Sequence, residues 1–293
     1  MSVAPGPDAG ATTFDAERPR LLGLAYRMTG SLADAEDVVQ DAWLRWSTAE
    51  VSAIDNPAAW LTTVATRLCL DRVRTADRRR ADYVGEWLPE PVATSRGPEE
   101  TAELAESLTL GFLVLLDRLS PTERAVFLLA DVFGEPYAAI GDTVGKSEVA
   151  CRQIASRARR KVHEERRGPP PDDDPELLNR LIGAVLAGDS DGLLDLLDPD
   201  VVLVSDGGPD RHAARRPVLG ADRVARLVLN IARRAGGGDA AIVEVNGRSS
   251  LVLDPPAGRI VTQIEQRNGR VTAIWVMLNP SKLHGLDGVI PLQ

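Results

Sequence analysis

The sequence is poor in aromatic residues, cysteine and histidine. Aromatic residues make up only 4% of its 293 residues, with two cysteines and three histidines. Cys69 and Cys151 lie in unrelated segments, so we expect neither a disulfide framework nor a metal cluster, as fits a reducing cytosol. His163, His212 and His284 give only a weak basis for acid–base chemistry. No metal and no cofactor is therefore expected.

Long apolar runs are also lacking. No stretch approaches the roughly 18 residues that a membrane helix needs. The opening MSVAPGPDAGATT lacks the basic and apolar regions of a signal peptide, and it is typical of a flexible tail. Glycine-rich phosphate loops, metal-ligand spacings and nucleophile elbows do not occur either. We expect a cytoplasmic protein that is not an enzyme and does not bind membranes.

The net charge of −9 argues at first against a nucleic-acid partner, but the charge is uneven along the chain. Of the four consecutive blocks 1–85, 86–117, 118–171 and 172–293, only 118–171 is net positive, with 10 basic and 7 acidic side chains. A basic block can bind the phosphate backbone even in an acidic chain.

This basic block has the spacing of a helix-turn-helix. Gly141 is small enough for two helices to cross closely, Gly145 allows the turn, and Ser147 is expected to cap the second helix. The outer face of that helix is polar and cationic, as entry into a DNA major groove requires. The residues of this predicted DNA-reading face are Lys146, Ser147, Glu148, Arg152, Gln153, Arg157 and Arg160.

Two helices are predicted earlier in the chain. Ser31 begins the first, whose apolar residues recur at helical spacing, and its other face is coherently acidic and predicts a partner surface: Asp34, Asp37, Gln40 and Asp41. Asn56 and Pro57 open the second helix, which has Trp60 near its start and Arg67, Arg72 and Arg74 near its end. Such a helix can stack bases and hold phosphates. The alternative, a core tryptophan with solvated arginines, stays equally open.

The last third changes character after GPPPDDDP at 168–175, which marks a boundary. Two short helices, two strands and a further helix precede four strand-like runs that are separated by hairpin signals such as Asn246-Gly247. This order predicts an α+β domain with a curved sheet against helices. In the preceding linker, WLPEPV at 87–92 places Trp87 and Leu88 where a flexible linker needs no apolar residue, so both are expected to dock.

The segments DAEDVVQDAWLRW, NPAAWLTTVATRLCLDRVR and LSPTERAVFLLADVFGEPYAAIGDTVGKSEVACRQIASRARRKV together resemble regions 2 and 4 of an extracytoplasmic-function (ECF) sigma factor of bacterial RNA polymerase. The last third resembles a SnoaL-like domain of the NTF2-like superfamily, as in the sigma-J-like subgroup. The resemblance implies a multidomain protein with two all-α sigma domains and a C-terminal α+β cone. We place region 2 at 14–84, the linker at 85–109, region 4 at 110–167, the SnoaL-like domain at 172–284 and a tail at 285–293.

The resemblance also implies roles. The acidic face would dock on core RNA polymerase, whose β′ clamp and β subunits are the expected partners together with promoter DNA. Asn56 and Trp60 would capture an unstacked base of the −10 element, while Arg67, Arg72 and Arg74 would hold phosphates. The predicted DNA-reading face would recognise the −35 element.

The fused domain is implied to regulate the factor, in place of or beside an anti-sigma protein. Contacts are expected from Trp87, Leu88 and the end segment, namely Asn279, Pro280, Lys282 and Leu283. Residual enzymatic or sensing activity is an alternative, with Asp206, His212 and Trp275 as a possible pocket for an unknown small-molecule ligand. A different alternative is a helix-turn-helix repressor with a ligand-binding domain.

Overall fold

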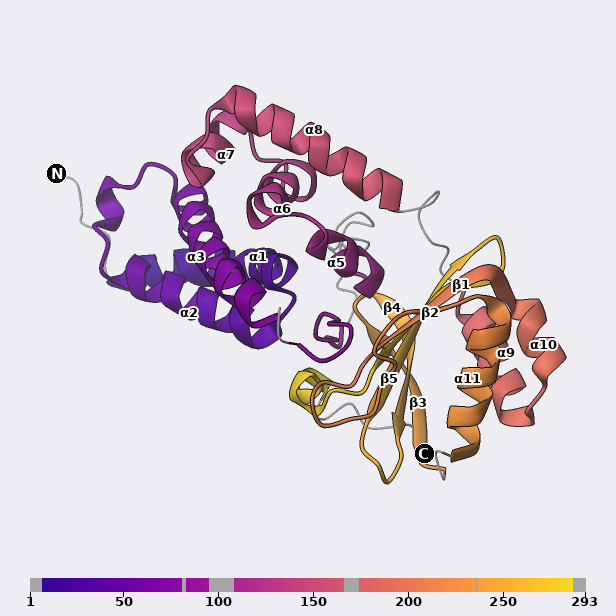
Figure 1. The fold of residues 1–293 in the computed structure, drawn as a ribbon. Helices are drawn as coiled ribbons and strands as arrows, with labels where there is room; N and C mark the ends of the chain where they lie inside the picture. Colours follow the sequence, from indigo (N-terminus) through magenta and orange to yellow (C-terminus); the bar gives the residue numbers. More distant parts are fainter. Residues whose placement is uncertain (1–6, 81–82, 95–107, 166–173, 235–236, 287–293) are drawn as a thin grey trace. The chain divides into compact units, whose positions relative to one another are not determined.

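The computed structural model describes residues 7–80, 83–94, 108–165, 174–234 and 237–286 (Figure 1). The chain forms two compact units. The first comprises Met1–Ala81 and Leu115–Arg167, and the second comprises Asp82–Val114 and Gly168–Gln293. The predicted linker tail at 95–107 and the end of the chain from 287 lie outside the described residues.

The first unit begins with three helices that pack on one another. They are α1 (Pro7–Thr29), α2 (Leu32–Ser47) and α3 (Pro57–Arg80), with the short 3-10 helix η1 (Val51–Ala53) before α3. Ser31 caps α2 by accepting a hydrogen bond from the Asp34 amide at 3.2 Å. Trp46, 1% exposed, fills the centre of this bundle. None of the helices in the described parts of the chain is long and apolar enough to cross a membrane.

The first helix begins inside the segment that the sequence predicted to be a flexible tail. A flexible tail was expected through residue 13, but α1 already begins at Pro7. The early turns are held from α2, because the Trp46 indole donates to the Gly10 carbonyl at 2.8 Å and the Phe14 and Trp43 rings meet edge to face at 5.0 Å. This tertiary packing outweighs the poor helix propensity of Gly10 and Pro19.

The rest of the first unit is the helix-turn-helix domain. Its elements are α5 (Leu110–Asp117), which crosses the division between the units, α6 (Pro121–Phe127), the π-helical turn η2 (Leu128–Val132), α7 (Tyr137–Val144) and α8 (Glu148–Glu165). Ser120 and Glu123 form a capping box at the start of α6. Gly145 ends α7 in the left-handed conformation, with φ of 71°, which glycine adopts at no steric cost.

The second unit contains a six-stranded sheet in the order β2-β1-β6-β5-β4-β3. Only β1 and β6 are parallel, and the other neighbours are antiparallel. The strands are β1 (Leu197–Asp206), β2 (Val218–Leu219), β3 (Asp239–Val245), β4 (Arg248–Asp254), β5 (Ile260–Arg267) and β6 (Arg270–Met277). The helices α9 (Pro175–Ala187), α10 (Ser190–Leu196) and α11 (Ala221–Arg234) lie together at the sheet (Figure 1). This is the predicted α+β architecture.

Side chains alternate between the two faces of this sheet, and each face has its own core. Val201 and Leu203 of β1 point into a core with the leucines of α9 and α10. Val204 points into a second core, to which the linker contributes Leu88. The end segment contributes Leu283 and Leu286 from the 3-10 turns η3 (Pro280–Lys282) and η4 (His284–Leu286). The linker and the end segment therefore cover the sheet face that the helices leave open.

The close packing at Gly141 predicts that alanine substitutions at two glycines have opposite effects on stability. A Cβ on Gly141 would lie 2.6 Å from the Lys146 carbonyl oxygen, whereas a Cβ on Gly183 in α9 meets nothing within 4 Å. We expect Gly141→Ala to destabilise the first unit by about 1–3 kcal/mol through overpacking. Gly183→Ala is the matched control and should raise stability by about 0.5–1 kcal/mol. Calorimetry of both full-length variants checks this, and equal melting temperatures would contradict it.

Candidate nucleic-acid and partner interfaces

The predicted DNA-reading face of α8 is fully open to solvent. Cys151, Ile154 and Ala158 are buried against the rest of the domain, and Ser147 caps the helix by accepting from the Ala150 amide at 3.2 Å. All seven predicted residues are exposed: Lys146, Ser147, Glu148, Arg152, Gln153, Arg157 and Arg160. Arg152 pairs with Glu148. The sequence pattern thus separated the packed side of α8 from its open side.

Two neighbouring cations of α8, which are also exposed, have partners on other elements of the domain. Arg159 donates to Asp131 at 2.7 Å and to the Tyr137 hydroxyl at 2.8 Å. The hydrogen bond that Arg159 donates to the Asp131 carboxylate is the main cause of the raised pKa of Arg159. Lys161 pairs with Glu123 at 2.9 Å. These two side chains fix α8 on its domain, which leaves the exposed row to contact a ligand.

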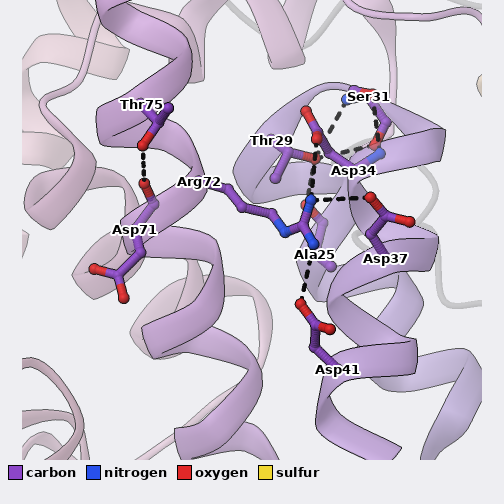
Figure 2. A network of polar contacts seen from close by, with 9 residues as sticks. All are labelled: Ala25, Thr29, Ser31, Asp34, Asp37, Asp41, Asp71, Arg72 and Thr75. Atoms are coloured by element: carbon purple, nitrogen blue, oxygen red, sulfur yellow. Dashed lines mark hydrogen bonds and ion pairs between the residues drawn. The ribbon is translucent and has the colours of Figure 1, made fainter.

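The acidic face of α2 surrounds one arginine of α3, as Figure 2 shows. The Arg72 guanidinium lies 3.4 Å from Asp34 and 3.0 Å from both Asp37 and Asp41. Burial works against the charge of Arg72, but the hydrogen bonds to Asp41 and Asp37 outweigh it and raise its pKa. Gln40 is exposed on the same face. Arg72 was predicted to hold DNA phosphates; in the structure it joins three carboxylates, an association that the sequence spacing did not indicate.

The start of α3 has a structural role as well as an open surface. The Asn56 side chain is exposed and caps α3 by accepting from the Ala59 amide at 3.1 Å. The Trp60 ring is half-buried, with its centroid 5.5 Å from that of Trp46. Trp60 is therefore packed on the bundle core and remains partly exposed. Its role in stacking a base stays a prediction.

The two other predicted phosphate contacts differ in their surroundings. Arg67 donates to the carbonyl oxygens of Asp142 at 2.7 Å and Thr143 at 3.1 Å. These carbonyls belong to the last turn of α7, where a cation interacts favourably with the helix dipole. Arg74 is exposed and lies 3.4 Å from Asp71. In this conformation Arg67 thus joins α3 to the helix-turn-helix, while Arg74 remains open to solvent.

Two further arginines that join one helix to another segment were not predicted from the sequence. Arg124 is 3% exposed and donates to the Met28 carbonyl at 2.7 Å, while Arg20 pairs with Glu135 at 2.6 Å. A single arginine in a helical pattern carries no signal that it will reach a distant helix, so only the fold reveals these contacts.

In the second unit, a buried carboxylate holds the linker and the end segment together. Asp206, 1% exposed, pairs with Lys282 at 2.7 Å and accepts from the Leu88 amide at 2.9 Å. The Tyr83 hydroxyl also donates to Asp206, and the Asn279 amide donates to Tyr83 at 2.8 Å. Burial of Tyr83, together with its hydrogen bond to the Asp206 carboxylate, raises the pKa of Tyr83 well above its usual range. We call these five residues the Asp206 cluster.

The Asp206 cluster brings together most of the predicted interdomain residues. The Lys282 ammonium donates to the Leu88 carbonyl at 2.6 Å and lies 4.0 Å from the centre of the Trp87 ring. Leu283 is buried in the second core, whereas Pro280 is exposed at the start of η3. A cation over an aromatic face in a buried site adds to the attraction of the ion pair.

The three possible pocket residues lie in different surroundings. Asp206 is enclosed by the Asp206 cluster and His212 is exposed, while the buried Trp275 indole nitrogen finds no hydrogen-bond partner among the described residues. Two hollows of about 840 and 410 Å³ in this unit lie elsewhere, along α11, and share Arg226 in their lining. The predicted pocket therefore finds no support in these two hollows.

Two known domain families match the first part of the chain. Residues 13–79 match the family model of sigma-70 region 2, and residues 110–162 match that of sigma-70 region 4. The chain thus has the two conserved domains of a sigma factor, in order, with a helix-and-sheet domain after them. Sigma factors bind core RNA polymerase and promoter DNA.

Full-length relatives identify the group. The chain is similar to the ECF RNA polymerase sigma factor SigJ of Mycobacterium tuberculosis, with 40% identity over 93% of this chain and 92% of the relative. It is also similar to the probable ECF sigma factor SigI of that organism, at 35% identity over 95% and 96%. A crystal structure of SigJ covers 94% of this chain and 98% of its own, with 38% identity and a TM-score of 0.78. The chain belongs to the ECF RNA polymerase sigma factors, which confirms the predicted family and fold class.

The Asp206 cluster gives a prediction for stability. Lys282→Met would leave the buried Asp206 carboxylate without its cation, which should cost about 3–5 kcal/mol of unfolding free energy. The double variant Asp206→Asn/Lys282→Met removes both charges, so it should be more stable than Lys282→Met alone. Lys161→Met is the control; it breaks an ion pair whose lysine is 48% exposed and should cost at most about 1 kcal/mol. Urea unfolding of the full chain measures all three, and equal losses for Lys282→Met and Lys161→Met would contradict the prediction.

Proposed function

We propose that the chain recruits core RNA polymerase through the acidic face of α2 and directs it to promoters with −35 and −10 elements. The basic clamp of the β′ subunit is the partner that suits this acidic face, with further contacts to the β subunit. Charge complementarity of this kind favours fast and correctly oriented association. Arg72 supports the proposal, because it holds Asp34, Asp37 and Asp41 in one arrangement before any partner binds.

The single observation that carries promoter recognition is the exposed row of α8. A helix with Arg152, Gln153 and Arg157 open to solvent can enter a major groove and reach base edges there. Lys146 and Arg160, at the borders of this row, suit phosphate contacts that fix the register without reading sequence. We assign the −35 element to this face.

The −10 element is assigned to the surface formed by Asn56, Trp60 and Arg74. Flipping a base out of the stack costs a few kcal/mol, which a protein surface must return by stacking and hydrogen bonding. Trp60 supplies a partly exposed ring and Asn56 an exposed amide. Arg67 can join them only after it leaves the α7 carbonyls, so we propose that the described first unit is a closed form that opens on the polymerase.

The C-terminal domain is proposed to regulate the factor through the linker. Leu88 is bound at its amide by Asp206 and at its carbonyl by Lys282, so the linker after region 2 is held at a defined place on the sheet. Holding it shortens the freely moving chain between the two DNA-binding regions. In this proposal the Asp206 carboxylate holds the linker in place and takes no part in catalysis.

Arg72 provides a test of the polymerase surface. Arg72→Gln removes the contacts to three aspartates, which then repel one another and lose their common arrangement, so we expect affinity for core polymerase to fall about tenfold, or about 1.4 kcal/mol. Arg72→Lys should recover little, since a lysine cannot bridge the carboxylates in the same fork geometry. Arg74→Gln is the matched control, because its partner Asp71 lies outside the acidic face. Fluorescence titration with core polymerase decides; unchanged or tighter binding by Arg72→Gln would oppose the proposed role.

In vitro transcription tests the function as a whole. Purified core polymerase would be combined with a promoter library and with three forms of the chain: full length, ending at residue 171 and ending at residue 278. We expect specific initiation with the full-length protein, and a changed level with the form ending at 278, because that form lacks Asn279 and Lys282 of the Asp206 cluster. Comparing the form ending at 171 with the full-length protein shows whether the whole C-terminal domain raises or lowers initiation. Duplex binding without initiation by any form would refute the sigma function for this chain.

A further inference from the structure

The helix α11 places its charges on the side that faces away from the core. Val224 and Ala225 are buried, while four arginines stand exposed at spacings of 3, 10 and 11 residues from the first: Arg223, Arg226, Arg233 and Arg234. At 100° per residue these spacings fall on one side of a helix. We call these four residues the arginine stripe.

The arginine stripe belongs to the most basic short segment of the C-terminal domain. Residues 211–234 contain seven arginines and one acidic residue, Asp222, in a chain whose net charge is −9. The surplus of six positive charges in 24 residues disappears when charge is averaged over the whole of 172–293. Averaged over such long blocks, only the block with the helix-turn-helix is net positive.

The arginines of the stripe have no carboxylate partner among the described residues. Arg226 donates its Nε to the backbone carbonyl of Asp222 at 3.2 Å, and no ion pair involves Arg223, Arg233 or Arg234 within the part of the chain that the structure describes. Other arginines, such as Arg72 and Arg124, have carboxylate partners. Asp222 is the one acidic side chain of α11, so the four guanidinium groups leave a surplus of positive charge on this face that suits an external anion.

We propose that the arginine stripe binds the phosphate backbone of DNA and gives the C-terminal domain its own, sequence-independent DNA contact. From Arg223 to Arg233 the helix rises about 15 Å, at 1.5 Å per residue. That length matches about four base-pair steps of 3.4 Å, enough for three of the arginines to meet separate phosphates. Arginine is well suited to this role, because its planar fork binds phosphate oxygens in pairs.

The composition of the face favours DNA over an acidic protein. Asn230 stands between Arg226 and Arg233, so the stripe itself is polar along its length. The arginines and Asn230 offer hydrogen-bond donors along the helix, as a phosphate backbone requires. Arg226 and Arg233 also line the hollow of about 840 Å³ together with Leu227 and Leu229, so a protein partner is the alternative outcome of the test.

The test is the salt dependence of DNA binding by the full-length chain. Arg223→Gln/Arg226→Gln/Arg233→Gln would be compared with wild type on a labelled 60-base-pair duplex of arbitrary sequence, by fluorescence anisotropy between about 50 and 200 mM salt. Each lost phosphate contact makes the slope of log K against log salt shallower by about 0.9. We expect a slope shallower by about 2–3, and the same loss on a second duplex of scrambled sequence.

A charge-matched control separates this contact from a general effect of net charge. Arg18→Gln/Arg45→Gln/Arg180→Gln removes three exposed arginines elsewhere and should keep the wild-type slope. An unchanged slope in the stripe variant, or an equal change in the control, would overturn the proposal, and reduced transcription with an unchanged slope would assign the stripe to a protein partner instead. Failure of the wild-type chain to bind any duplex would count against promoter recognition as well, which distinguishes the two proposals.

Discussion

A β-sheet has two faces, and both must be covered if its strands carry apolar side chains on each side. In this protein α9, α10 and α11 cover one face, and a linker with the last two 3-10 turns covers the other. This requirement explains why a segment rich in proline contains Leu88 at 1% exposure. It also explains the buried ion pair of Asp206 and Lys282, since polar backbone groups of a covering segment need partners. The contact between the linker and the sheet is thus a consequence of the need to cover the second sheet face.

The sigma regions depend on charge in a different way. Arg72, Arg67 and Arg124 each reach from one helix to another and satisfy either carboxylates or helix-terminal carbonyls. Two of them belong to the basic end of α3 that the family resemblance assigns to DNA. A side chain that holds the closed form and also contacts DNA in the open form couples the two states, because it cannot serve both at once.

The sequence predicted the parts of the fold whose signals are local. Gly141, Gly145 and Ser147 marked the helix-turn-helix, and Asn246-Gly247 marked a hairpin, because turns and caps depend on a few adjacent residues. The early start of α1 was missed, since it rests on Trp46 reaching Gly10 across 36 positions. The Arg72 contacts and the pairing of Asp206 with Tyr83 were missed for the same reason. The helical spacing of exposed residues on α2 and α8 was predictable, whereas the partner of each charged side chain was not.

The residues of the Asp206 cluster are synthesised at different times. Leu88 and Lys282 are separated by 194 residues, so a ribosome completes both sigma regions well before it makes the lysine that holds the linker. Domains fold in sequence as they emerge, at about 5–20 residues per second. Lys282 follows the end of region 4 at residue 167 by 115 residues, so each new molecule passes through an interval of roughly 6–23 seconds before this lysine is made. Under the proposed regulation, the promoter-binding regions exist without their restraint during that interval.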